Sequence, residues 1–231
     1  MKLTQLLTTT AAFALSALGV HAATVTAFSP AVWPRTDADL GITGFQIEDF
    51  EDATLIPGLQ VQLSGGSADF GPTSTIPHVF TVADDPNGSL FSAAIWDGTH
   101  FLLNRNTAPV PVGYVDSQWA DISFLVPGGT QSLGFSLHQL EVTGTQMSVT
   151  TTSGVTIFGL DTLPNFSVNS GRNGYVRVDA DPGESILSVK VDNLSGDGFA
   201  FDHVAVNPVP EPTSAVLLLA GVAGLGLRRR R

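Results

Sequence analysis

Short runs in which apolar and polar residues alternate recur along most of the chain, and they constrain its fold more than any other feature. A period of two is the pattern of a β-strand that buries one face. Glycine, proline, asparagine and aspartate separate the runs, as tight turns require. No stretch between residues 23 and 207 keeps a helical period. The clearest runs are residues 24–28, 120–126, 132–138, 147–152, 174–178, 186–191 and 199–206.

These runs predict one all-β domain over residues 23–207. Its 185 residues are enough for a single hydrophobic core, and no linker divides them. Regular short strands separated by turns favour a sandwich or a barrel. We predict an antiparallel, jelly-roll-like β-sandwich. The chain has no cysteine, so this fold must be stabilised by its core or by a bound metal.

The charge of the predicted domain is strongly acidic. Residues 23–207 contain 20 acidic and five basic residues. Nucleic acid is excluded as a partner, because binding a phosphate backbone requires a basic surface. The same balance favours solubility and the binding of divalent cations.

The first 22 residues are typical of a secretory signal peptide. Lys2 supplies the positive charge, residues 6–20 form a short apolar helix core, and Val20-His21-Ala22 offers small residues before a cleavage site. We therefore expect a signal helix at residues 1–22 and export of the chain that follows it.

The last 23 residues combine three features in a fixed order. A Val209-Pro210-Glu211-Pro212 step leads into an apolar segment, residues 213–227, and four arginines follow at 228–231. As a helix, 15 residues span about 22 Å, against a hydrocarbon core of roughly 30 Å. The predicted transmembrane helix is therefore marginal as a permanent anchor. The positive-inside rule keeps the arginines in the cytoplasm and places the domain outside.

This order resembles the PEP-CTERM sorting signal of exopolysaccharide-making Gram-negative bacteria, with Val209, Pro210, Glu211 and Pro212 as the sorting motif. The resemblance implies a precursor tethered in the inner membrane, processed by an exosortase, and then located at the cell surface or outside the cell. It makes exopolysaccharide a candidate partner. The alternative for the tail is a plain C-terminal anchor.

Two acidic segments resemble those of jelly rolls of the carbohydrate-binding-module type, residues 47–52 and 199–206. In that family an early Phe-Glu step and an aspartate before the last strand's valine often hold a structural calcium. The resemblance implies Glu51 and Asp202 as ligands, with Glu48 or Asp49 as helpers. Calcium takes about six to eight oxygen ligands, which clustered carboxylates can supply. The chain departs from the family in having a histidine at position 203. The alternative is a solvated acidic loop.

No catalytic motif stands out in the sequence. It lacks a Gly-x-Ser-x-Gly elbow, a His-Glu-x-x-His pair, a P-loop and a cysteine nucleophile. We therefore expect a non-enzymatic structural or binding role at the cell surface or in the extracellular matrix. A lectin-like module is one alternative, in which Trp96 and Trp119 stack on sugar rings instead of packing in the core. A polysaccharide hydrolase is the other.

Overall fold

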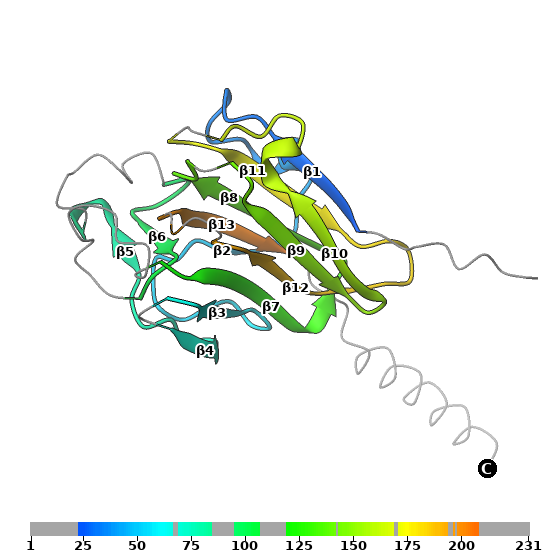
Figure 1. The fold of residues 1–231 in the computed structure, drawn as a ribbon, viewed down its shortest axis with the longest axis horizontal. Helices are drawn as coiled ribbons and strands as arrows, with labels where there is room; N and C mark the ends of the chain where they lie inside the picture. The colour runs from blue at the N-terminus through cyan, green and yellow to red at the C-terminus, as the bar shows by residue number, and fades with distance from the viewer. Residues whose placement is uncertain are drawn as a thin grey trace, which may run out of the picture.

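The computed structural model describes residues 23–66, 69–84, 95–106, 119–141, 143–168, 171–193, 196 and 198–207. Within them the chain forms two antiparallel sheets that pack face to face (Figure 1). This arrangement confirms the predicted all-β sandwich and is compatible with its jelly-roll-like description. The signal peptide, the sorting motif at 209–212, the apolar segment at 213–227 and the arginines at 228–231 lie outside the described residues.

The first sheet has the order β1-β11-β8-β13-β6-β5, and β2 also pairs with β13. Its strands are β1 (Thr24–Phe28), β2 (Gln46–Glu48), β5 (Phe80–Thr81), β6 (His100–Leu103), β8 (Ser132–His138), β11 (Gly174–Asp179) and β13 (Ala200–Val206).

The second sheet has the order β10-β9-β12-β7-β3-β4. Its strands are β3 (Gln60–Ser64), β4 (Phe70–Thr73), β7 (Asp121–Thr130), β9 (Gln146–Thr151), β10 (Gly154–Gly159) and β12 (Ile186–Val191). The helical elements of the described residues are α1 (Asp37–Leu40), η1 (Val82–Asp84) and η3 (Leu160–Thr162). None of them is long and apolar enough to cross a membrane.

Aromatic rings join the two sheets at the centre of the core. The ring of Phe124 on β7 lies 5.6 Å from that of Phe135 on β8 and 5.1 Å from that of Phe201 on β13, between centroids. Aromatic pairs at such distances contribute about 0.5–1.5 kcal/mol each beyond the burial of their area. The alternating residues of β7 therefore face the opposite sheet, as the sequence pattern requires.

The first sheet is covered on both faces. Every residue of β8 and β13 is buried, although alternation ordinarily leaves one face of an antiparallel sheet in water. The segment 29–45, with the short helix α1, packs over the outer face. A second apolar cluster forms there from Leu40, Ile42, Trp96, Tyr175 and Ala205. We call this covering layer, residues 29–45 together with 95–97, the outer layer.

Helix α1 begins at a capping box that the sequence encodes locally. The backbone N–H of Asp39 donates to the Thr36 hydroxyl, and the Asp39 carboxylate accepts from the Thr36 N–H. The helix ends at Gly41, whose φ of 69° suits glycine. Arg177 on β11 then donates to the Leu40 carbonyl at 2.5 Å, which fixes the helix to the sheet.

Candidate functional site

Strand β13 carries a β-bulge at Asp202 and His203, in the middle of the first sheet. Its register with β8 shifts between Asp202 and Ala205, and His203 has a φ of 50°. Phe201 and Val204 both pack in the core between the sheets, so the two residues between them turn toward the outer layer. Bulges re-aim side chains, and a positive φ at a non-glycine residue is strained. The strained backbone of this bulge therefore places two titratable groups, Asp202 and His203, side by side.

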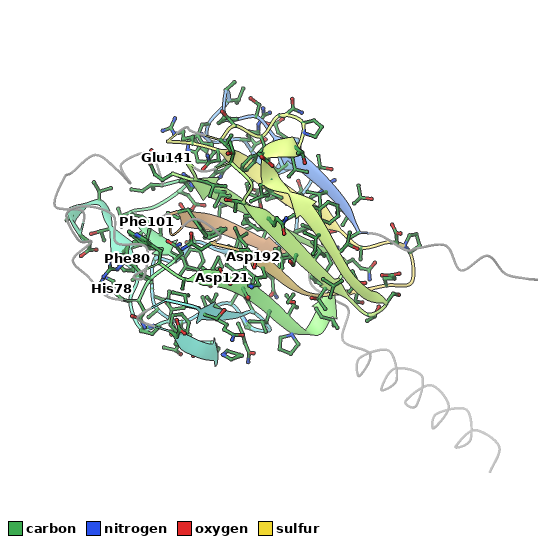
Figure 2. All side chains as sticks on the ribbon, in the orientation of Figure 1. His78, Phe80, Phe101, Asp121, Glu141 and Asp192 are labelled. Carbon is green, nitrogen blue, oxygen red and sulfur yellow. The ribbon has the colours of Figure 1, made fainter. Side chains whose placement is uncertain are left out.

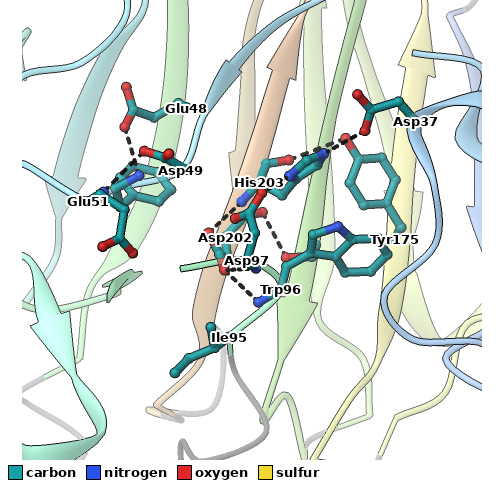
Figure 3. A network of polar contacts seen from close by, with 12 residues as sticks. Asp37, Glu48, Asp49, Glu51, Ile95, Trp96, Asp97, Tyr175, Asp202 and His203 are labelled. Carbon is teal, nitrogen blue, oxygen red and sulfur yellow. Dashed lines mark hydrogen bonds and ion pairs between the residues drawn. The ribbon is translucent and has the colours of Figure 1, made fainter. Parts of the chain in front are cut away.

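The Asp202 carboxyl group connects this bulge to the loop at residues 95–97 (Figure 3). Its Oδ2 accepts from the backbone N–H of Trp96 at 2.5 Å and of Asp97 at 3.2 Å. Its Oδ1 accepts from the N–H of His203 at 2.7 Å. The Asp202 side chain is fully buried. One side chain therefore satisfies three backbone donors that have no water to bond to.

The His203 imidazole links the same loop to helix α1. Its Nδ1 lies 2.5 Å from Oδ2 of Asp97, and its Nε2 lies 3.2 Å from Oδ1 of Asp37. The Trp96 ring lies 5.7 Å away, between centroids, and the Tyr175 hydroxyl donates to the His203 carbonyl at 3.3 Å. Only the protonated imidazole can donate to both carboxylates. We call Asp37, Asp97, Asp202 and His203 the latch cluster.

The protonation of Asp202 depends on its surroundings in the latch cluster. Burial, followed by the charge of Asp97, raises the pKa of Asp202 to about 8. The N–H bonds from Trp96, His203 and Asp97 act in the opposite direction and are outweighed. The cluster therefore binds a proton near neutral pH that an aspartate in water would have released.

The predicted calcium ligands near β2 also accept backbone donors. Glu48 accepts from the N–H of Phe50 at 2.9 Å and of Ile56 at 2.7 Å, and burial raises its pKa. Asp49 is exposed and accepts from the Glu51 N–H at 3.2 Å. Both residues therefore act as acceptors that shape the turn at residues 48–56.

Glu51 holds the start of β6. It accepts from the N–H of Thr99, from the N–H of His100 at 2.9 Å and from the Thr99 hydroxyl at 3.0 Å. Its Oε2 also lies 3.1 Å from Nδ1 of His100. The Thr99 N–H bond, followed by those of His100, lowers the pKa of Glu51 to about 2. Glu51 is therefore a charged acceptor for this loop.

The predicted calcium ligands lie in two groups. Figure 3 shows Glu48, Asp49 and Glu51 together, apart from Asp202 and His203. Among the described residues, no three or more His, Cys, Asp or Glu side chains are arranged to hold a metal ion. A calcium ion at either group would compete with the N–H donors for the same oxygens. The geometry does not fit the predicted cage, and calcium binding stays a prediction.

Both predicted stacking tryptophans are buried. Trp96, 6% exposed, packs in the outer layer with its ring centroid 4.3 Å from that of Trp33. Trp119, 4% exposed, packs in an apolar cluster with Phe80 and Phe101, which Figure 2 shows together at the β5–β6 edge. This burial agrees with the core-packing alternative, and a role for either ring in ligand stacking stays a prediction.

A hollow of about 680 Å³ opens at one end of the sandwich, between the loop after β1 and the loop before β11. Its lining mixes hydroxyl, amide, aromatic and guanidinium groups: Ser29, Pro30, Ala31, Asn165, Phe166, Ser167, Gly171 and Arg172. None of these described residues is acidic, although the domain is. Sequence reasoning missed this hollow. The one signal that could have marked it is the rarity of cations, because Arg172 is one of only five in residues 23–207.

Buried hydrogen bonds fix the wall of the hollow that precedes β11. The Asn173 side chain is fully buried and donates to the carbonyls of Ser167 at 2.7 Å and Leu140 at 2.8 Å. It also accepts from the Leu140 N–H at 2.8 Å. The next residue, Gly174, has a φ of 138°, and a Cβ there would lie 2.7 Å from the Phe28 carbonyl oxygen. Only glycine allows the two walls to approach this closely.

Contacts of two arginines fix the opposite wall of the hollow and the charged residue in its lining, Arg172. Arg35 donates to the Ser29 carbonyl at 3.1 Å through Nη2 and at 3.3 Å through Nε. The guanidinium of Arg172 lies over the Trp33 ring, 5.3 Å from its centroid. The hollow is therefore formed before any ligand arrives.

Comparison with known proteins identifies the tail. Residues 208–231 match the PEP-CTERM protein-sorting motif, which includes Val209, Pro210, Glu211 and Pro212. This match confirms the predicted sorting signal. The chain is an exosortase-sorted exported protein of a Gram-negative bacterium, tethered to the membrane before processing and then located at the surface. No curated protein and no solved structure is significantly similar to the chain.

Proposed function

We propose that the exported domain is a non-enzymatic binding module of the cell surface or extracellular matrix, and that it holds polysaccharide in the hollow. The observation that carries this proposal is the lining of the hollow. A sugar ring has apolar C–H faces and a rim of hydroxyl groups, and it needs both kinds of partner. Phe166 supplies an apolar face, while Ser29, Asn165, Ser167 and Arg172 supply polar groups. The volume of the hollow lies within the range of about 300–1,000 Å³ that is common for ligand sites.

The latch cluster supports the non-enzymatic part of this proposal. A glycosidase needs two carboxyl groups that face each other across the substrate. Asp202 is fully buried, and its two oxygens accept three backbone N–H groups. His203 is 7% exposed and lies between two carboxylates of the outer layer. These contacts suit a cluster that holds loops to a sheet.

We expect the exported protein, purified from culture, to bind at least one class of polysaccharide on a glycan array and to leave the length of the sugar chains unchanged. The formation of new reducing ends would contradict the non-enzymatic role. A protein that no glycan retains would contradict the binding role.

Melting curves of the exported protein in calcium and in chelator test the calcium site predicted from the sequence. That prediction requires calcium to raise the melting temperature above its value in chelator, by about 2–4 °C per kcal/mol of binding free energy. Glu51→Ala should remove the gain. Identical melting curves in calcium and in chelator would contradict the site.

A further inference from the structure

We propose that the outer edge of β10 is a self-association surface, at which β10 of a second copy of this chain pairs antiparallel with it about a two-fold axis. The second sheets of the two copies then join into one continuous sheet. This inference does not depend on the hollow or on its ligand.

The side chains of β10 leave apolar surface in water at the end of a sheet. The strand ends the second sheet and has β9 as its neighbour there. Val155 and Ile157 are 62% and 60% exposed and point to the same face. Among the described residues, Val32 is the other exposed large apolar side chain. The edge therefore presents two β-branched side chains of the kind that cross-strand pairs bury.

The outward backbone groups of β10 follow from its pairing with β9. The N–H of Leu160 donates to the Thr145 carbonyl at 3.0 Å, which continues the register of the two strands. Hydrogen-bonded positions alternate along an antiparallel pair. The backbone groups of Val155, Ile157 and Gly159 therefore point away from β9, toward the position of an added strand.

One register suits a strand added from a second copy. The Gly159 carbonyl accepts from the Thr162 hydroxyl at 2.8 Å, which leaves Val155 and Ile157 to bond the added strand. A two-fold axis at Thr156 places Val155 opposite Ile157 of the second copy. Both residues have outward backbone groups, so each such pair exchanges both of its hydrogen bonds. The exposed β-branched side chains then meet on one face.

The opposite face of the strand is compatible with this register. Thr156 meets Thr156 of the second copy, and the partly buried Phe158 lies opposite Gly154. Glycine has no side chain to collide with the ring, and an aromatic ring across from an edge glycine covers it. Both faces of β10 therefore match a second β10.

The charge of the domain also favours this edge as the place where two copies meet. With 20 acidic and five basic residues in 23–207, two copies repel wherever their carboxylates approach. Residues 143–160, which include β9 and β10, contain no Asp, Glu, Lys or Arg. Two copies that meet at β10 therefore bring uncharged strands together.

The strands at the other ends of the two sheets are less suited to pairing. β4 contains Pro72, which cannot donate a hydrogen bond, and β5 has only two residues. None of the exposed large apolar side chains in the described residues belongs to β1. β10 has no proline, no charge and no bulge in its register with β9.

The contact is short, so we expect association to be weak in solution. One strand pair buries less than the roughly 1,200 Å² at which specific, stable interfaces begin. The precursor is tethered to the membrane, and tethered copies meet at a raised effective concentration. The edge therefore pairs copies where they are concentrated at the membrane.

A single cysteine tests the register, because the chain has none of its own. In Thr156→Cys the two cysteines would face each other at a non-hydrogen-bonded position, with Cα atoms about 4.5 Å apart, which a disulfide can span. Under mild oxidation, we expect the full exported protein with this change to form at least about tenfold more covalent dimer than Val32→Cys, which is exposed in the outer layer. Ile157→Cys should also form little dimer, since it lies opposite Val155.

Sedimentation velocity measures the association without a cross-link. The wild-type exported protein should shift toward dimer as its concentration rises to about 1 mM. Val155→Glu should weaken the association by at least about tenfold, because a charge enters the edge of each copy. The control is Thr150→Glu, which adds the same charge opposite Val155 but one strand further in, and should change the association by less than about twofold. Circular dichroism and melting curves establish that each variant is folded.

Two kinds of result would overturn the inference. A wild-type protein that stays monomeric at about 1 mM, or a Thr156→Cys variant that cross-links no more than Val32→Cys, would contradict pairing at this edge. Equal cross-linking of Ile157→Cys and Thr156→Cys, or undiminished association of Val155→Glu, would place the dimer in another register or on another surface.

Discussion

Replacing Asp202 with alanine is expected to lower the free energy of unfolding by about 2–5 kcal/mol, the largest loss of stability that we predict for one substitution. The N–H groups of Trp96, Asp97 and His203 would lose their common acceptor at a fully buried position. A buried donor without an acceptor costs about 1–3 kcal/mol. Urea unfolding of the exported protein measures the change.

Two variants make this measurement specific. Asp202→Asn keeps an oxygen acceptor and should cost less than Asp202→Ala. Asp49→Ala removes the same carboxylate from an exposed position where it accepts only from Glu51, and should cost under about 1 kcal/mol. Equal losses in Asp202→Ala and Asp49→Ala would contradict the role of Asp202 in holding the loop.

The same residue should make stability depend on pH. The pKa of Asp202 is about 8 in the folded protein and near its ordinary value of 3.8 in the unfolded chain. The folded state therefore binds the proton more tightly. The stabilisation is complete below about pH 4 and is lost as the pH rises to about 8, with a slope of up to about 1.4 kcal/mol per pH unit.

The control for this pH dependence is the Asp202→Asn variant. It keeps Asp37, Asp97, His203 and Tyr175 around the position, so the difference between the two curves isolates Asp202. The lowered pKa of Glu51 acts in another window, since its stabilisation is present above about pH 4.5 and is lost toward pH 2. Parallel curves for wild type and variant between pH 4 and 8 would contradict the raised pKa of Asp202.

The second large effect is expected in the tail. Changing Pro210, Glu211 and Pro212 together to alanine should block processing, and wild-type mature protein should lack Arg228 to Arg231. The reason is that the match to the sorting motif begins at residue 208 and includes all three positions. Mass spectrometry of the exported protein measures the mass of the wild type and of the triple variant.

Asn207→Ala is the control for the tail, because it lies directly before the matched residues, and it should be processed normally. An intact C-terminus on wild-type protein from cells with a functioning exosortase would contradict this prediction.

Alternation predicted the strands well where a strand buries one face. The run at 120–126 became the first part of β7, and 186–191 became β12. The alternation did not predict that the first sheet is covered on both faces. The outer layer uses Trp33, Leu40 and Ile42, which follow no strand or helix period, so their burial depends on tertiary contacts alone.

The site was predictable only as a set of acidic positions. Glu51 and Asp202 stood out in the sequence, but the N–H donors of Thr99 and Trp96 lie 48 and 106 residues away from them in the chain. A carboxylate that accepts amide hydrogens and one that binds calcium look the same in a sequence. The bulge at His203 and the hollow around Arg172 also arise from segments that meet only after folding.

The position of β13 determines when this protein can fold during export. The strand ends at Val206, two residues before the match to the sorting motif begins, yet it lies inside the first sheet, hydrogen-bonded to β8, β6 and β2. Until residues 200–206 have crossed the inner membrane, those neighbours have unpaired edges that could accept a foreign strand. The first sheet can therefore be completed only when residues 200–206 lie on the same side of the membrane as β8, β6 and β2.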